Sequence, residues 1–165
     1  MHGWCKNWSL SRFTSFNSFW IFLITFVFKK MINTKIIKIA SYTKNAGLKN
    51  NFTHKSNVKN SLCGDIIKTE FVANSSIIKS MRYETESCIL CEASASLFSR
   101  KVKNKKINIL VKEIKKLKKL KKNSKSNFPK NFKEFNQLIR HKNINRLDCV
   151  ILPMDAFLKA FKVKE

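Results

Sequence analysis

The sequence predicts an α+β domain, because one stretch alternates as an antiparallel hairpin and helical patterns surround it. In residues 66–73, Ile67, Thr69 and Phe71 fall on one face and charged side chains on the other. The Asn-Ser-Ser segment at 74–76 is a turn signal, and residues 77–85 return as a second strand. The polar residues 48–60 are expected to form a loop that leads into an edge strand.

Helices are expected on both sides of the hairpin. Apolar residues recur at helical spacing in residues 31–46, and Gly47 follows as a C-cap-like glycine. The pattern becomes helical again from 88 to 102, where Ile89 is expected to face inward and a run of Ala and Ser permits close helix packing. Further helices are expected at residues 107–122, 132–140 and 150–161.

The composition fits one domain of 165 residues with a strong positive charge, 34 Lys and Arg against 10 Asp and Glu. Codon drift in an AT-rich genome explains this profile, since Lys, Asn, Ile and Phe are abundant. A polyanionic partner also explains it, and the lysine-rich helix at 107–122 is the place where RNA or a membrane surface would bind. We favour drift and expect nucleic acid not to be a partner.

The first 30 residues differ from the rest. They hold all three Trp, and residues 19–28 are almost wholly apolar. This run is shorter than the roughly 20 residues of a membrane-spanning helix, and no small-residue cleavage site follows it. Residues 1–30 are therefore interpreted as a targeting or membrane segment or a non-native extension, and residues 31–165 as the domain.

Five cysteines in a chain of this length do not resemble a secreted disulfide scaffold, so reduced thiols in the cytoplasm are expected. Cys63 and Asp65 flank a glycine that permits a turn, so both side chains can face one ion. Cys88 and Cys149 each stand at a predicted helix start, where the helix dipole is expected to lower a thiol pKa. Three thiolates and one carboxylate suit a tetrahedral zinc site or a cluster cradle. Cys91 is interpreted as a packing residue.

Three segments together carry a family resemblance: LCGD at 62–65, SCILCEASASLFSRKV at 87–102 and DCVILPMDAFLKAF at 148–161. They resemble the U-type iron–sulfur cluster scaffolds, which comprise IscU, SufU and the N-terminal domain of NifU. The likeness spans residues 31–161. It implies a SufE/NifU-like α+β fold, with helices packed on a small antiparallel three-stranded sheet.

The resemblance also implies a site and partners. Cys63, Asp65, Cys88 and Cys149 correspond to the ligands of a transient [2Fe–2S] cluster, and zinc is the alternative occupant. A cysteine desulfurase would supply persulfide sulfur to Cys149 or Cys88, and apo iron–sulfur proteins would receive the cluster. The implied role is a scaffold without catalytic residues, although sulfurtransferase activity is an option.

Two departures leave alternatives open. Asp148 stands where IscU-like members have a histidine, and the long segment between Cys91 and Cys149 is closer to the SufU branch. A zinc-bound sulfur-transfer partner of a desulfurase is therefore the first alternative. A basic nucleic-acid or membrane-surface module is the second, and loss of function by drift is a third.

Overall fold

The computed structural model describes residues 34–121, 128–139 and 146–163 of the chain. The chain divides into two compact units, Met1–Thr34 and Lys35–Glu165. The first unit, with the apolar run at 19–28, lies almost wholly outside the described residues, so the description below concerns the second. In the part of the chain that is described, no helix is both long and apolar enough to cross a bilayer.

The sheet has three antiparallel strands in the order β1-β2-β3, which confirms the predicted α+β class. The strands are β1 (His54–Lys59), β2 (Ile66–Asn74) and β3 (Ile77–Glu86). The predicted hairpin is confirmed: β2 and β3 are joined by a tight turn in which Ser75 has a φ of 52°. The inward side chains of β2, Ile67, Thr69 and Phe71, are all buried.

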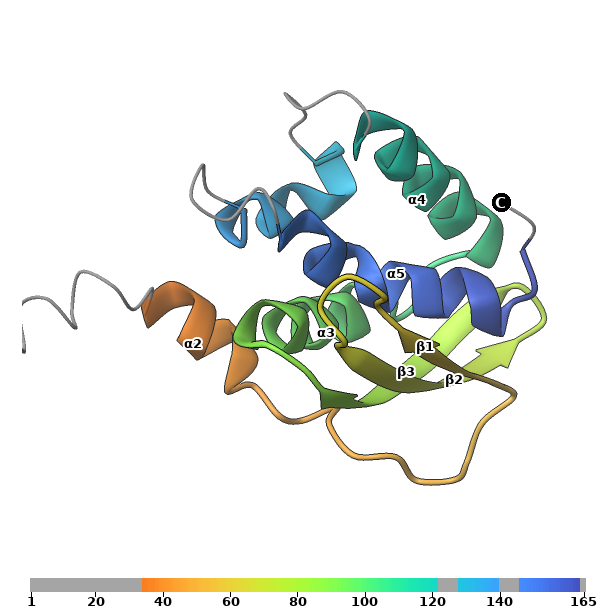
Figure 1. Cartoon of the computed structure of the whole chain (residues 1–165). Helices are drawn as coiled ribbons and strands as arrows, with labels where there is room; N and C mark the ends of the chain where they lie inside the picture. Colours follow the sequence, from red (N-terminus) through yellow and green to blue (C-terminus); the bar gives the residue numbers. More distant parts are fainter. Residues whose placement is uncertain (1–33, 122–127, 140–145, 164–165) are drawn as a thin grey trace, which may run out of the picture. The chain divides into compact units, whose positions relative to one another are not determined.

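Helices pack on one face of this sheet (Figure 1). Helices α3 (Ile89–Lys101) and α5 (Leu147–Ala160) lie side by side against the strands. Helix α4 (Ile107–Lys121) and the 3-10 helix η1 (Lys130–Gln137) lie beyond them, on the side away from the sheet. The short α2 (Thr34–Ala40) completes the described set. The predicted helices at 88–102 and 107–122 are thus confirmed.

Five details of the sequence prediction are wrong. Residues 48–60 were expected to be a loop, but strand β1 (His54–Lys59) lies within them and pairs with β2. The first helix ends at Ala40, and Gly47 is no C-cap, because its N–H donates to the carbonyl of Tyr83 at the sheet edge. The segment expected to be a helix at 132–140 is a 3-10 helix that ends at Gln137. The last helix begins at Leu147, three residues early. Ile89 is 49% exposed, because the first residue of α3 has no neighbouring turn to cover it.

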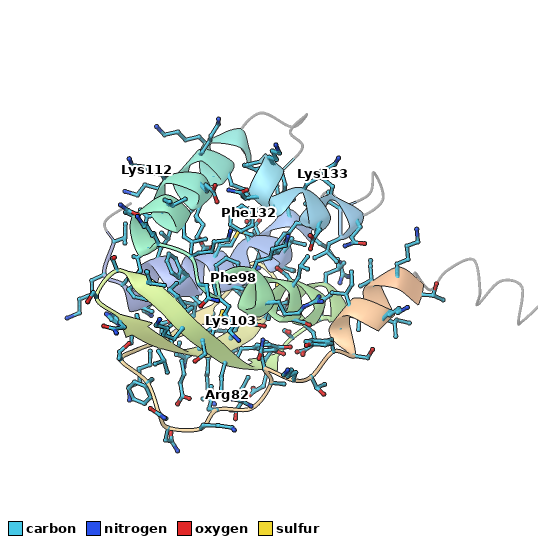
Figure 2. All side chains as sticks on the ribbon, turned by 180° about the vertical axis from the view of Figure 1, so that it is seen from behind. Arg82, Phe98, Lys103, Lys112, Phe132 and Lys133 are labelled. Carbon is cyan, nitrogen blue, oxygen red and sulfur yellow. The ribbon has the colours of Figure 1, made fainter. Side chains whose placement is uncertain are left out.

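Aromatic rings connect the layers through the core. Phe157 of α5 meets Phe71 of β2 edge-on at 5.6 Å between ring centroids, and Phe98 of α3 at 6.1 Å. Phe98 in turn stacks on Phe132 of η1 at 6.2 Å, and Figure 2 shows these two side chains in the interior. Each fully buried ring contributes about 1.5–3 kcal/mol, so this chain of rings fixes α5 between the sheet and η1.

The segment at 41–53 crosses part of the opposite face of the sheet (Figure 1), and its single isolated β-bridge joins Ala46 to Tyr83 of β3. Arg82 donates to the carbonyls of Gly47 and Ala46. The Glu70 carboxylate accepts the N–H groups of Lys49 and Asn50 at 2.9 and 3.1 Å. Glu70 is therefore only 4% exposed despite its charge, whereas Lys68 and Glu84 on the same face of the hairpin stay exposed.

Candidate metal centre

The loop between β1 and β2 carries the first two candidate ligands, and Asn60 shapes it. Its backbone N–H donates to the carbonyl of Asp65 at 2.8 Å, and its carbonyl accepts the N–H of Gly64 at 2.9 Å. Its side-chain Oδ1 accepts the N–H of Leu62 at 2.9 Å. Asn60 was not singled out from the sequence, although an Asn that opens a tight turn is a recognisable signal.

Gly64 gives the loop its sharp turn between Cys63 and Asp65. Its φ of 78° lies in the left-handed region, which residues that have a Cβ atom rarely adopt. A Cβ added there would meet nothing within 4 Å. The glycine is therefore required by the backbone conformation and not by crowding, as the sequence predicted.

Cys88 is the N-cap of α3 and makes no side-chain capping bond. Its backbone N–H donates instead to Oδ1 of Asp65, at 3.1 Å. The carboxylate thus lies at the positive end of α3, where a negative charge is stabilised. This contact joins the loop that bears Cys63 to the helix that bears Cys88.

Cys149 lies in the first turn of α5 and is only 3% exposed. Its Sγ is 3.4 Å from Sγ of Cys63, which is 86 residues away in the sequence. The ligand atoms of Cys63, Asp65 and Cys149 all lie within 4.8 Å of one another. The structure therefore brings three of the four candidate ligands into one cluster, and Cys88 adjoins that cluster through Asp65.

The Asp65 carboxyl is held in its ionised form. Burial raises its pKa, but the nearby thiols of Cys88, Cys149 and Cys63 and the hydrogen bond from the Cys88 N–H outweigh burial and lower it below 3.8. The second oxygen, Oδ2, is buried and has no hydrogen-bond partner. A buried anionic oxygen without a donor is a ligand atom that a cation would satisfy.

The pKa of Cys149 is raised, so the predicted lowering is wrong for this thiol. Burial is the largest cause, followed by hydrogen bonds to Cys63 and Asp65 and by the charge of Cys88. A helix terminus contributes only about 0.3–1 kcal/mol at an exposed site, which is too little to offset burial beside a carboxylate. A bound metal ion reverses this balance, since a coordinating thiol is deprotonated.

The donor set fits a soft or borderline metal. Thiolates prefer zinc and iron–sulfur clusters, and a carboxylate beside them supplies a harder and weaker ligand. Cys63 is exposed whereas Asp65 and Cys149 are buried, so the cluster of ligands is open on the side of the Cys63 loop. Such a site can exchange its metal with the outside.

Two other residues with metal-binding side chains, Cys91 and His54, lie in the described part of the chain and do not belong to the cluster. Cys91 is fully buried in the core, and burial raises its pKa to about 12, which supports the packing interpretation. His54 stacks on Phe161 at 4.2 Å between ring centroids. His2, Cys5 and His141 lie outside the described residues.

The fold and the cluster define the class: a small α+β domain with an open site of thiols and one carboxylate. The sequence matches the family model of the NifU-like N terminal domain over residues 31–138, and the chain belongs to that family. The matched range includes Cys63, Asp65 and Cys88 and ends before Cys149. No curated protein sequence matches the chain.

Solved structures show the same fold. A NifU-like protein (N-terminal) from Brucella abortus has 19% identity and a TM-score of 0.67, with 79% of this chain and 91% of that one covered. A proposed iron–sulfur cluster assembly scaffold for the SUF system of Fervidobacterium islandicum has 21% identity and a TM-score of 0.66, with coverages of 78% and 95%. At these identities the likeness concerns the fold.

Proposed function

We propose that the protein is an iron–sulfur cluster assembly scaffold that holds a transient [2Fe–2S] cluster as cargo. The observation that carries the proposal is the convergence of Cys63, Asp65 and Cys149 within 4.8 Å, at the end of α3 where Cys88 is the N-cap. Membership in the NifU-like N-terminal family supports it. The proposed ligands are Cys63, Asp65, Cys88 and Cys149.

Sulfur would arrive as a persulfide from a cysteine desulfurase. A thiolate of Cys149 or Cys88 attacks the outer sulfur of the donor's persulfide, a new S–S bond forms, and the donor cysteine leaves as a thiolate. Cys63 is the most exposed of the three thiols and lies at the mouth of the site. Asp65 accepts the Cys88 N–H and keeps a negative charge beside the incoming iron.

Asp65 also explains how a cluster could leave again. A carboxylate is a weaker ligand for a cluster than a thiolate, so one corner of the cluster would be held loosely. Release of the cluster to apo iron–sulfur proteins needs such a weakly bound position. A protein that keeps its cluster permanently for electron transfer does not need one. We propose that this exchange takes place in the cytoplasm, with the desulfurase and the apo acceptors as partners. Apart from the cysteine that accepts sulfur, no residue is assigned a catalytic role.

A zinc-bound sulfur-transfer partner of the desulfurase is the second candidate, favoured by the tetrahedral donor count and the orphaned Oδ2 of Asp65. The structure gives a separate basic module less support. Leu110, Ile114 and Leu117 of the apolar stripe of α4 are buried in the core, and Ile107 and Val111 are partly buried against it. This helix is therefore not free to insert into a membrane, although exposed lysines such as Lys112 point outward (Figure 2).

The test is anaerobic reconstitution of the full chain with ferrous iron, cysteine and a cysteine desulfurase. A scaffold develops visible sulfur-to-iron charge-transfer absorption, which Cys63→Ser and Cys149→Ser abolish and Cys91→Ala leaves intact. The zinc candidate predicts one tightly bound zinc ion that blocks cluster formation and accelerates the desulfurase. A chain that acquires neither cluster nor zinc would refute both candidates.

A further inference from the structure

Helix α5 has an interruption close to its candidate ligand. Pro153 lies inside the helix, one turn after Cys149. Proline has no N–H, so the carbonyl of Cys149 receives no helical hydrogen bond from the residue four positions on. The turn that carries Cys149 is therefore joined to the rest of α5 by fewer backbone bonds than an ordinary first turn.

A side chain from α3 contacts this turn. Ser94 is fully buried, and its Oγ donates to the carbonyl of Val150 at 2.5 Å. Val150 follows Cys149 directly, and α3 begins at its N-cap Cys88. The hydroxyl of Ser94 thus links the helix of one candidate ligand to the turn that bears another.

The other end of α5 is held separately. Ser56 of β1 donates to the carbonyl of Ala156 at 2.7 Å and also bonds Thr69 of β2. Lys159 donates to the carbonyl of Asn57 at 2.8 Å. These contacts fix the part of α5 that follows Pro153 to the sheet, and the Ser94 bond acts on the part before it.

We infer that Ser94 is a positioning residue that holds the Cys149 turn against α3 and so sets the place of the Cys149 sulfur relative to Asp65 and Cys88. The inference rests on the proposed function for its consequence, since positioning matters only if these residues share a ligand. A buried hydroxyl can do this because no water reaches the interior to replace a lost bond between α3 and this turn.

The experiment compares Ser94→Ala with Ser96→Ala in the full chain. Ser96 is the matched control: it is equally buried on α3, but its Oγ donates to the carbonyl of Tyr42 and not to α5. Cobalt(II) is the probe, since thiolate-to-cobalt absorption reports both affinity and geometry. Ser94→Ala is expected to weaken cobalt binding about tenfold and to change the band intensities, the size typical of residues that orient ligands. Ser96→Ala is expected to bind as the wild type does.

Pro153→Ala supplies the second test. It returns an N–H to the Cys149 carbonyl, so Ser94→Ala in that background is expected to weaken cobalt binding less than threefold. If Ser94→Ala does not fold by itself, the comparison of Pro153→Ala with the Pro153→Ala, Ser94→Ala double variant still tests the inference. Equal losses from Ser94→Ala and Ser96→Ala, or a full tenfold loss in the Pro153→Ala background, would overturn the inference.

Amide hydrogen exchange of the metal-free protein separates this inference from the proposed function. Ser94→Ala is expected to speed exchange in the peptide around Ile151 and Leu152 by about tenfold, and Ser96→Ala is not. If the wild type shows no thiolate–cobalt absorption, the proposed function fails, whereas unchanged exchange in Ser94→Ala refutes the positioning.

Discussion

Replacing Gly64 by alanine tests whether the backbone of the Cys63 loop shapes the site. Gly64 has a φ of 78°, and its Cβ would have free space, so the cost is purely conformational. An alanine in the left-handed region costs about 1–2 kcal/mol. For a domain of this size, 1 kcal/mol lowers the melting temperature by roughly 4 °C.

Gly47→Ala is the matched control for this change. Gly47 has a φ of 79°, and a Cβ there would lie 4.0 Å from Nη2 of Arg82, an ordinary contact. Both variants are therefore expected to lose the same stability in thermal or urea unfolding. Only Gly64→Ala is expected to weaken cobalt binding, by about tenfold, because the loop relieves its strain by moving Cys63 and Asp65.

Gly64→Asn refines the comparison, since asparagine tolerates the left-handed region better than alanine. It is expected to recover part of both the stability and the cobalt affinity. The reasoning is refuted if Gly64→Ala unfolds at the wild-type temperature. It is equally refuted if Gly47→Ala weakens cobalt binding as much as Gly64→Ala does.

Three further predictions concern single side chains. Asp65→Ala is expected to lengthen the lifetime of a reconstituted cluster and slow its transfer to an apo ferredoxin, and transfer at the wild-type rate would contradict the weak-ligand role. Cys91→Ala is expected to lower the free energy of unfolding by about 1 kcal/mol, from the smaller buried side chain, while cobalt binding stays unchanged. Burial, aided by the charge of Glu92, raises the pKa of Tyr83 from 10.0 to about 12. The folded state therefore keeps the Tyr83 proton more tightly, so this stabilisation is complete below pH 10 and is lost as the pH rises through 12. Tyr83→Phe is expected to flatten that alkaline part of the unfolding profile, and identical profiles for the two proteins would show that Tyr83 does not titrate there.

The hairpin could be predicted because its signals are local. Alternation in β2 and the Asn-Ser-Ser turn depend on neighbours in sequence, and so does the helical run after Cys88. Helix ends are predicted less accurately, because tertiary contacts decide them. Helix α2 ends at Ala40, and the chain then crosses the sheet, where Arg82 and Glu70 form hydrogen bonds with its backbone. The sequence of residues 31–46 contains no local signal that the helix ends at Ala40.

The candidate ligands could be selected from the sequence, whereas their electrostatics could not. Cys63 and Asp65 are close in sequence, whereas Cys149 is a candidate because it stands at a predicted helix start and because the family resemblance includes it. Its raised pKa follows from burial beside Cys63 and Asp65, which only the folded chain reveals. The role of Ser94 depends on a backbone carbonyl of α5, and no residue pattern records such a contact. Asn60 bonds residues of its own loop, so the turn signal is the local feature that could have marked it.

The contact between Cys63 and Cys149 has a consequence for how the molecule matures. These thiols come from the first strand connection and the last helix, so the chain between them must be made and folded before they meet. A nascent chain that has not yet extended past Leu147 presents Cys63 and Asp65 but not the buried thiol. A ligand that requires both sulfurs therefore binds only chains in which α5 has folded, and its binding energy then adds to their stability. Loading of the site thus reports that α5 has been made and has packed beside the loop of Cys63.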